Sequence, residues 1–385
     1  MLPIFLAALA NVIGLGVIVP LLPYFALHHG AGAAEAAWLF SVFSLAQFLT
    51  APLWGRLSDK IGRKPVILIS FAGSTLGYVW LAFANDLLGI YLARIFSGVM
   101  NGWLATSQAY VADVTDEEGR AKGMGLLGAA FGLGFIFGPA LGGYLAGDAV
   151  VNYQLPMLIA AAGSASAFLV SAFMLREPAG RKSRKGSDVR FLPHLFSMPV
   201  LGVLILLYFC LFFVFAGMES TLALWCERML DMGPRQVGYY LAFAGICGVV
   251  VQGWLVGKLA PRIGELRLVM IGIACLGFGL GGIPFVTVEI WLLLPIALLS
   301  IGFGFANPSL QSLISRTAPE ALRGATMGIA QSANSLGRIL GPYWAGTAFV
   351  TIGVAWPFYS GVIILLPVLI FTGLLARRLA ATDEQ

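Results

Sequence analysis

A glycine- and charge-rich segment lies between two apolar stretches: Gly55-Arg56-Leu57-Ser58-Asp59-Lys60-Ile61-Gly62-Arg63-Lys64-Pro65. About 202 positions later it returns as Gly257-Lys258-Leu259-Ala260-Pro261-Arg262-Ile263-Gly264. A second group of residues repeats with a shift of 203 and pairs Arg120, Gly134, Gly138-Pro139 and Gly143 with Arg323, Gly337, Gly341-Pro342 and Gly346. Two independent matches at nearly one spacing indicate a duplicated unit.

The composition assigns this duplicated unit to a membrane. Of the 385 residues, 59% are hydrophobic and 11% are charged, whereas a soluble domain carries about a quarter charged residues. A helix needs about 20 apolar residues to cross the bilayer core. Twelve such stretches occur, six in each half, at 3–27, 36–54, 65–84, 87–111, 123–146, 152–175, 199–225, 236–257, 268–288, 290–315, 324–349 and 352–376.

We therefore predict an all-α membrane protein with twelve transmembrane helices, built as two six-helix bundles. The first bundle covers residues 1–175 and the second covers residues 199–385. A polar and basic linker, 176–198, joins them and contains Arg181-Lys182-Ser183-Arg184-Lys185. Because the unit is duplicated, we expect a pseudo-two-fold axis to relate the two bundles.

The lysines and arginines predict the orientation of the helices, because positively charged loops stay on the cytoplasmic side. With both termini in the cytoplasm, the even-numbered connections and the C-terminal tail hold all but four of the 23 lysines and arginines. Of these four, Arg228 and Arg235 lie in outer loops, and Arg94 and Arg338 lie inside spans. The net charge of +5 then reflects loop topology, so we expect no nucleic-acid partner.

The repeated segment and a second motif resemble a known family. Residues 55–65 read Gly-x-Leu-Ser-Asp-x-x-Gly-Arg-Lys-Pro, and the fifth span contains Gly134-x-x-x-Gly138-Pro139-x-x-Gly142-Gly143. Together with the two six-helix halves, these motifs resemble the drug:proton antiporter branch of the major facilitator superfamily. The stretch Gly-Leu-Gly-Val-Ile-Val-Pro-Leu-Leu-Pro at 14–23 is similar to tetracycline and multidrug efflux transporters. The resemblance covers essentially the whole chain and implies the major facilitator fold.

The resemblance implies a secondary transporter that exports amphipathic organic compounds or drugs in exchange for protons by alternating access. It implies a place in the inner membrane of a bacterium, a part in antibiotic resistance, and a small molecule, protons and the lipid bilayer as partners. We expect a monomer. Transporters of the tetracycline group carry acids where this chain has Asn11 and Gly77, which argues against a tetracycline–metal chelate as substrate.

The fifth span has the composition of a hinge. Its small residues remove side chains, so that a neighbouring helix can approach closely. Pro139 removes one backbone hydrogen bond and permits a bend. We expect a sliding or rocking contact, with static packing as the alternative, at Gly134, Gly138, Pro139, Gly142 and Gly143.

The segment 55–65 has features that a positively charged anchor does not explain. Gly55 and Gly62 are expected to allow tight turns. Asp59 is a lone acid among four cations. A cytoplasmic anchor accounts for the cations, whereas the acid indicates a further role.

The resemblance implies that this segment is a gating latch between the two halves. In that latch Arg63 pairs with Asp113 at the end of the fourth span. Asp59 faces the start of the eleventh span, where the partial positive charge of a helix N-terminus favours an anion. We assign Arg120, which repeats as Arg323, to the same latch.

Three ionisable side chains lie inside the spans: Arg94 in the fourth, Glu219 in the seventh and Arg338 in the eleventh. A charge in hydrocarbon costs at least about 2.5 kcal/mol unless it faces a cavity or a partner. Arg94 and Glu219 both lie in the outer half of the membrane, and the resemblance places their helices around the central cavity. We expect Glu219 and Arg94 to couple proton flow, with a permanent ion pair between the halves as the alternative.

Neutral polar residues add candidate substrate contacts. Asn11 and Asn307 are the better candidates, because the resemblance places their helices at the cavity. Hydrogen bonding between helices explains a single asparagine or glutamine in a span equally well. The full set of predicted substrate-binding residues is Asn11, Arg94, Glu219, Asn307, Gln311, Asn334 and Arg338.

Other classes of function have less support in the sequence. No Gly-x-x-x-x-Gly-Lys-Ser/Thr loop is present, so we expect no ATP-driven pump, and we expect no cofactor and no metal site. No nucleophile–base pair or His/Cys/Asp cluster occurs in a span, so an enzyme is not expected. The main alternative is a metabolite facilitator or symporter of the same fold. A receptor or scaffold that does not transport is a weaker one, because it has no need of a latch and hinge glycines.

Overall fold

The computed structural model describes residues 1–147, 151–178 and 198–383. Within these ranges the secondary structure is helical, without strands, as the composition predicted. Most of the predicted linker 176–198 lies outside the described residues.

The chain forms two compact units. The first consists of Met1–Arg184 together with Cys226–Gly245, and the second of Lys185–Trp225 together with Ile246–Gln385. The segment Cys226–Gly245 thus packs with the first unit, although it follows the predicted linker in the sequence. The predicted bundle boundaries, 1–175 and 199–385, remain a prediction, since the division between the units runs through helices.

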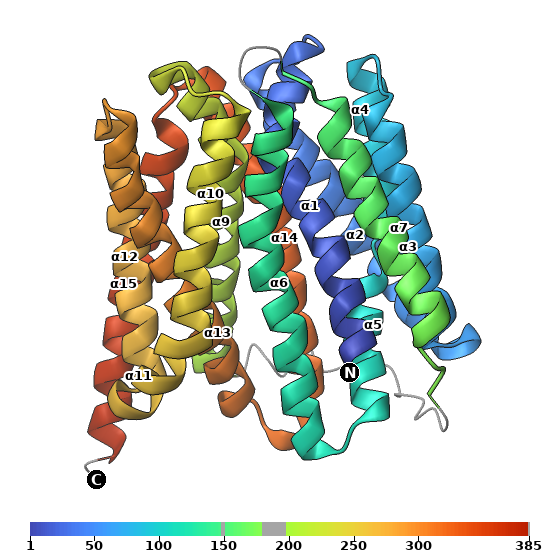
Figure 1. Cartoon of the computed structure of the whole chain (residues 1–385). Helices are drawn as coiled ribbons and strands as arrows, with labels where there is room; N and C mark the ends of the chain where they lie inside the picture. The colour runs from blue at the N-terminus through green and yellow to red at the C-terminus, as the bar shows by residue number, and fades with distance from the viewer. Residues whose placement is uncertain (148–150, 179–197, 384–385) are drawn as a thin grey trace. The chain divides into compact units, whose positions relative to one another are not determined.

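The helices of the first unit follow the six spans predicted for it. They are α1 Leu2–His28, α2 Ala33–Ile61, α3 Arg63–Ala82, α4 Leu87–Val99, α5 Trp103–Val114, α6 Glu117–Ala146 and α7 Gln154–Met174. Together α4 and α5 make the fourth span. Figure 1 shows α1 beside α6 and α3 beside α7.

The remaining helices repeat this order. They are α9 Pro199–Leu230, α10 Pro234–Val250, a π-helical turn Val251–Leu255, α11 Val256–Ile263, α12 Glu265–Gly282, α13 Leu293–Thr317, α14 Arg323–Thr351 and α15 Trp356–Asp383. Short 3-10 turns lie at Ile283–Phe285, Glu289–Leu292 and Glu320–Leu322. Within the second unit, α12 packs against α13 and α15.

Ten helical segments among the described residues are long and apolar enough to cross a membrane. The other two predicted spans are α14, which is richer in polar residues, and α15, whose described apolar part is Trp356–Ile370. Large apolar side chains lie on the outside of the helices, among them Phe173, 84% exposed, and Phe278, 75% exposed. Soluble proteins rarely expose such a surface, so we assign it to lipid.

Glycines bring helix backbones together at equivalent places in the two units. A Cβ atom added to Gly138 of α6 would lie 2.6 Å from the Cα atom of Gly16 on α1. In the second unit, a Cβ atom on Gly341 of α14 would collide with the carbonyl of Phe213 and lie 3.1 Å from the nitrogen of Gly217, both on α9. The duplication seen in the sequence therefore extends to the packing of the helices.

Candidate functional site

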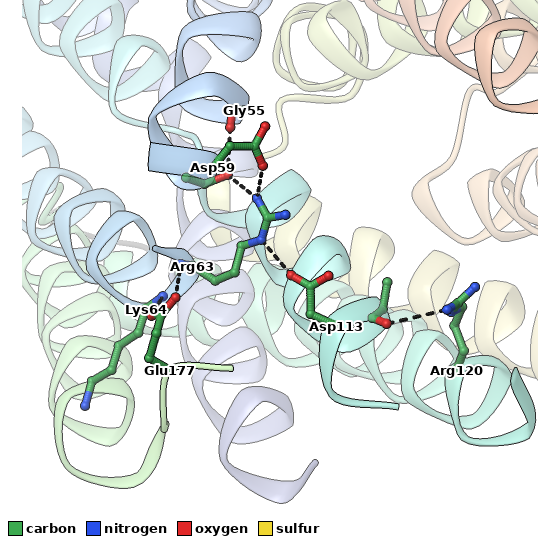
Figure 2. Close-up of polar contacts among 9 residues, drawn as sticks. Gly55, Asp59, Arg63, Lys64, Asp113, Arg120 and Glu177 are labelled. Carbon is green, nitrogen blue, oxygen red and sulfur yellow. Dashed lines mark hydrogen bonds and ion pairs between the residues drawn. The ribbon is translucent and has the colours of Figure 1, made fainter. Parts of the chain in front are cut away.

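A buried ion-pair cluster centred on Arg63 lies at the basic end of the first unit, where α2 ends and α3 begins (Figure 2). Arg63 Nε donates to Asp113 Oδ2 at 2.9 Å, and Nη1 donates to Asp59 Oδ1 at 2.8 Å. Nη1 also donates to Ser58 Oγ at 2.6 Å. The Arg63 side chain is only 6% exposed, so these carboxylates compensate a buried cation. The predicted Arg63–Asp113 ion pair is present.

Gly62 shapes the turn that places Arg63. Its φ of 115° lies in the left-handed region, where a side chain is unfavourable, and Gly264 between α11 and α12 has a φ of 85°. The prediction of a tight turn at Gly55 is wrong, because Gly55 lies inside α2, which continues to Ile61. Its carbonyl accepts a hydrogen bond from Ser58 Oγ at 2.8 Å. Only the second of the two glycines therefore ends a helix.

Glu177, which the sequence analysis missed, holds the start of α3. Its Oε1 accepts from the Arg63 N–H at 2.7 Å and its Oε2 from the Lys64 N–H at 2.9 Å (Figure 2). The first turn of a helix leaves its N–H groups without partners, and its partial positive charge favours a carboxylate. Lys64 Nζ also donates to the Ala172 carbonyl at 2.7 Å, so the end of α7 is tied to α3 twice. The available signal was an acid placed directly after an apolar span.

Arg120, which we assigned to the latch, lies beside the Arg63 cluster at the start of α6. Its Nη2 is 3.5 Å from the carbonyl oxygen of Ala112, the residue before Asp113 (Figure 2). Arg120 thus contacts the backbone at the end of α5. Its part in a latch remains a prediction.

The fourth span is interrupted at 100–102, between α4 and α5. At the interruption two side chains of α2 donate to the carbonyl of Val99: Trp54 Nε1 at 2.6 Å and Thr50 Oγ1 at 3.3 Å. A Cβ atom on Gly102 would collide with the Trp54 ring, so this position requires glycine. The sequence predicted one span over 87–111 and did not predict the break within it.

One predicted site residue, Asn11, lines a small polar hollow beside this break, and another, Arg94, contacts Phe43 in the lining of that hollow. The Arg94 side chain is buried, and its Cζ atom lies 4.3 Å from the ring centre of Phe43. Arg94 also interacts electrostatically with Tyr78. Asn11 Oδ1 accepts a hydrogen bond from Ser164 Oγ at 2.9 Å, which joins α1 to α7. The hollow is lined by Asn11, Leu15, Phe43, Ser74, Tyr78, Ser97, Asn101 and Trp103.

The second unit gathers three other predicted residues around Tyr208 of α9. Gln311 Nε2 donates to the Tyr208 hydroxyl at 2.7 Å and lies 3.1 Å from Asn307 Oδ1. The Asn334 side chain also reaches the Tyr208 hydroxyl, which is buried. Tyr208 was not predicted, because a tyrosine in an aromatic-rich span gives no distinct signal in the sequence. Tyr208 brings groups from α13 and α14 into one polar cluster.

Glu219 and Arg338, the charged residues predicted within spans of the second half, are electrostatic partners. Glu219 lies in α9 and Arg338 in α14, where the positive charge of the guanidinium attracts the carboxylate. Arg94 belongs to the other unit, so the Glu219–Arg94 coupling stays a prediction. The sequence identified each residue but gave no sign that Glu219 and Arg338 interact.

At the end of the first unit far from Arg63, α1 and α6 pack against residues 226–245. The Tyr24 hydroxyl donates to the Met232 carbonyl at 2.7 Å in a buried position. A Cβ atom on Gly143 would lie 2.9 Å from the Pro234 carbonyl oxygen, and one on Gly238 would lie 2.9 Å from the Gly143 Cα atom. The glycines predicted as a hinge in the fifth span therefore mark close backbone contacts of α6 with both α1 and α10.

The other predicted hinge residues of α6 face α1. A Cβ atom on Gly134 would lie 2.8 Å from the Val12 Cβ atom, and one on Gly142 would lie 2.9 Å from the Val17 Cα atom. Pro139 lies inside α6. These contacts are tight enough to exclude larger residues, and movement along them remains a prediction.

Comparisons with known proteins agree with this architecture. The sequence model of the Major Facilitator Superfamily matches residues 4–342. The class G tetracycline resistance protein of Vibrio anguillarum is 32% identical over 361 residues, which cover 90% of this chain and 89% of that protein. Multidrug resistance protein 2 of Bacillus subtilis is 28% identical over 371 residues, which cover 92% of this chain and 90% of that protein.

Solved structures show the same fold. The crystal structure of a mutant of the nucleoside transporter NupG superposes with a TM-score of 0.81, at 15% identity, over 96% of this chain and 98% of that one. Because the family model matches most of the sequence, the chain belongs to the Major Facilitator Superfamily. It is an integral membrane transporter.

Proposed function

We propose that this member of the Major Facilitator Superfamily exports amphipathic organic compounds or drugs in exchange for protons. The observation that carries the proposal is Glu219, an acid inside a membrane helix with Arg338 as its electrostatic partner. Similarity to tetracycline and multidrug resistance proteins over most of the chain supports a drug-like substrate. Asn11 and Gly77 stand where the tetracycline group carries acids, so the proposed substrates are compounds other than a tetracycline–metal chelate.

Glu219 is suited to carry a proton because its ionised form costs much more free energy inside hydrocarbon than its neutral form. When it is ionised, it attracts Arg338 and, in the predicted coupling, Arg94. Protonation removes that attraction and frees the site to change its partners. A site that loses its proton when substrate binds couples the two flows in opposite directions.

We propose that the polar groups of both units contact the substrate. In the first unit these are Asn11, which lines the polar hollow, and Arg94, which lies against Phe43 of its lining; in the second unit they are the amides around Tyr208. Aromatic and aliphatic side chains surround both sets, which suits compounds with one polar end and a large apolar body.

The two ends of the first unit are proposed to serve as gates. The Arg63 cluster supports a latch at the basic end, because its buried cation already holds two acids from different helices. The glycine contacts of α6 support a sliding surface, because they bring helix backbones within van der Waals distance of one another at Gly138, Gly142 and Gly143.

We propose that both termini lie in the cytoplasm and that the protein is a monomer in a bacterial inner membrane. The lysine and arginine distribution supports the orientation, and the bacterial sources of the relatives support the membrane. A reporter enzyme that is active only in the cytoplasm, fused to the C-terminus, should be active. An inactive fusion in a well-expressed protein would reverse the orientation.

The transport proposal is tested with purified protein in proteoliposomes. A panel of amphipathic compounds, including ethidium and tetracycline, is first screened for thermal stabilisation, because a compound that binds the folded state raises its melting temperature. A stabilising compound is then offered with and without a pH gradient. We expect the wild type to concentrate it only with the gradient, and Glu219→Gln to bind it without concentrating it.

Glu320→Gln makes the same acid-to-amide change at an exposed position outside the spans and should transport normally. Uptake by the wild type that equilibrates without regard to pH would favour a facilitator. Full pH-driven accumulation by a well-folded Glu219→Gln protein would refute the assignment of Glu219 as the proton carrier. Binding without any transport would point to a receptor.

A further inference from the structure

The second unit contains a polar cluster that repeats the Arg63 cluster with its charges exchanged. Arg63 opens α3, and Glu265, 202 positions later, opens α12. Asp113 lies at the end of α5, and Arg316, 203 positions later, lies at the end of α13. An arginine–aspartate pair in the first unit thus becomes a glutamate–arginine pair in the second, with 3.5 Å between Glu265 Oε2 and Arg316 Nη1.

An independent contact supports this equivalence. Arg120 at the start of α6 points its guanidinium at the Ala112 carbonyl, and Arg323 at the start of α14 donates to the Ser315 carbonyl at 3.1 Å. Both members of this pair shift by 203, and each carbonyl belongs to the residue before Asp113 or Arg316. Two separate contacts therefore align the same helix ends.

The charge that opens the helix is protected in both units, but the burial of its partner differs. Side-chain exposures are 6% for Arg63 and 13% for Asp113 in the first unit, and 17% for Glu265 in the second. Arg316 is 76% exposed, so the second unit pairs a largely buried carboxylate with a guanidinium that is exposed to solvent. Ser312 Oγ donates to Glu265 Oε1 at 2.5 Å and adds a hydrogen bond to the ion pair.

Helix electrostatics explain why only the first unit needs an extra acid. An anion at the start of a helix is favourable, whereas a cation there is unfavourable. Glu265 therefore suits the start of α12, but Arg63 and Lys64 do not suit the start of α3, and Glu177 compensates them. The positions that correspond to Glu177, 379 and 380, are leucine and alanine.

We propose that Glu265, Ser312 and Arg316, here called the Glu265 brace, are positioning residues that fix the rotation of α13 against α12. Ser312 directly follows Gln311, whose amide binds Tyr208 and contacts Asn307. Because the hydrogen bond from Ser312 to Glu265 fixes the rotation of α13 about its axis, it also fixes the direction in which the adjacent Gln311 side chain points. The inference rests on the proposed function, because it gives the brace the task of orienting groups that contact the substrate.

Hydrogen exchange of the full-length protein in detergent tests the brace without any substrate. We expect Glu265→Gln to raise amide exchange about threefold to tenfold in the first turn of α12 and in residues 311–316, as loss of one charged hydrogen bond should. Glu320→Gln, an exposed acid-to-amide change in the same unit, should leave both segments unchanged. Unchanged exchange at 311–316 in Glu265→Gln would overturn the brace.

A second measurement tests whether the Glu265 brace orients the side chains that are proposed to contact the substrate. With ethidium as probe, Glu265→Gln should raise the apparent Kd about threefold to tenfold and leave the transport rate at saturation nearly unchanged. Arg316→Lys should keep the wild-type Kd, and Arg316→Gln should raise it. A lower rate at unchanged Kd would refute the orienting role. If the wild type binds no member of the panel, the proposed function fails, and the exchange experiment still decides whether the brace exists.

Discussion

The Arg63 cluster and the Glu265 brace connect equivalent helix ends in the two units with ion pairs of opposite polarity. In both units a glycine with positive φ ends one helix, and a charged residue begins the next. A residue of opposite charge at the end of another helix forms an ion pair with it. The backbone of the repeat is therefore preserved while the side-chain chemistry is not. The first solution places a cation at a helix start and requires Glu177, which makes it the more elaborate of the two.

The strongest test of this comparison exchanges the charges of the first cluster. Arg63→Glu combined with Asp113→Arg keeps an ion pair but places a carboxylate against Glu177 and Asp59. We expect a loss of about 3–5 kcal/mol of stability, the size reported for an uncompensated buried charge, and little folded protein. Fluorescence-detected size-exclusion chromatography would measure the folded fraction.

Adding Glu177→Gln to this exchanged pair should recover part of the folded protein, because one of the repelling acids is then removed. If the protein with the exchanged pair alone is as abundant and as stable as the wild type, it does not matter for stability which of the two positions carries the positive charge.

A smaller effect is expected for Glu177→Gln alone. It removes the negative charge from the start of α3 and weakens two hydrogen bonds, so we expect about 1–2 kcal/mol less stability. Thermal unfolding in detergent measures the change. Glu35→Gln is the matched control, because Glu35 accepts a hydrogen bond from the Gly32 N–H at the exposed start of α2. An equal loss in both variants would contradict a special role for Glu177.

The two turn glycines should behave alike, whatever the charges around them. Gly62→Ala and Gly264→Ala each place a side chain in the left-handed region, which costs about 1–2 kcal/mol. Gly257→Ala, where an added Cβ atom meets open space, should be neutral or slightly stabilising. A large difference between Gly62→Ala and Gly264→Ala in thermal unfolding would show that the two turns are not equivalent.

The smallest change in stability is expected for Asp59→Asn. Asp59 itself is 38% exposed, and Asp113 still compensates the buried Arg63 when Asp59 loses its charge, so the loss should stay below about 1 kcal/mol. Its effect should appear in transport, as slower turnover and a population shifted toward the inward-open state. Cysteine labelling at the basic ends of α5 and α13 would detect the shift. Unchanged labelling together with unchanged turnover would remove Asp59 from the latch.

Features encoded by long patterns were predictable from the sequence. Apolar stretches gave the spans because a bilayer imposes a minimum length, and the repeated glycines gave the duplication. The Arg63–Asp113 pair was expected because the resemblance to a known family implies it. These features depend on composition and order along the chain, which a single sequence contains.

Contacts between distant residues were not predictable in this way. Glu177 meets Arg63 and Lys64 across more than a hundred residues, and no periodicity links an acid after one span to the start of another. The electrostatic pairing of Glu219 with Arg338 depends on which faces of α9 and α14 meet. The break after Val99 depends on donors from α2, so local propensity carried no sign of it.

The break in the fourth span has a mechanical consequence. A continuous helix transmits rotation along its length, so a twist applied at Asp113 would reach Arg94 if α4 and α5 were one rod. We expect the interruption at 100–102, where Trp54 donates to the Val99 carbonyl, to absorb such a twist, so that movement around Asp113 need not disturb Arg94. Its counterpart α13 runs as one helix from Leu293 to Thr317, so we expect a twist at Arg316 to reach Gln311 before it meets Pro308, which lies inside the helix. The fourth span is thus interrupted between Asp113 and Arg94, whereas its counterpart α13 is continuous between Arg316 and Gln311.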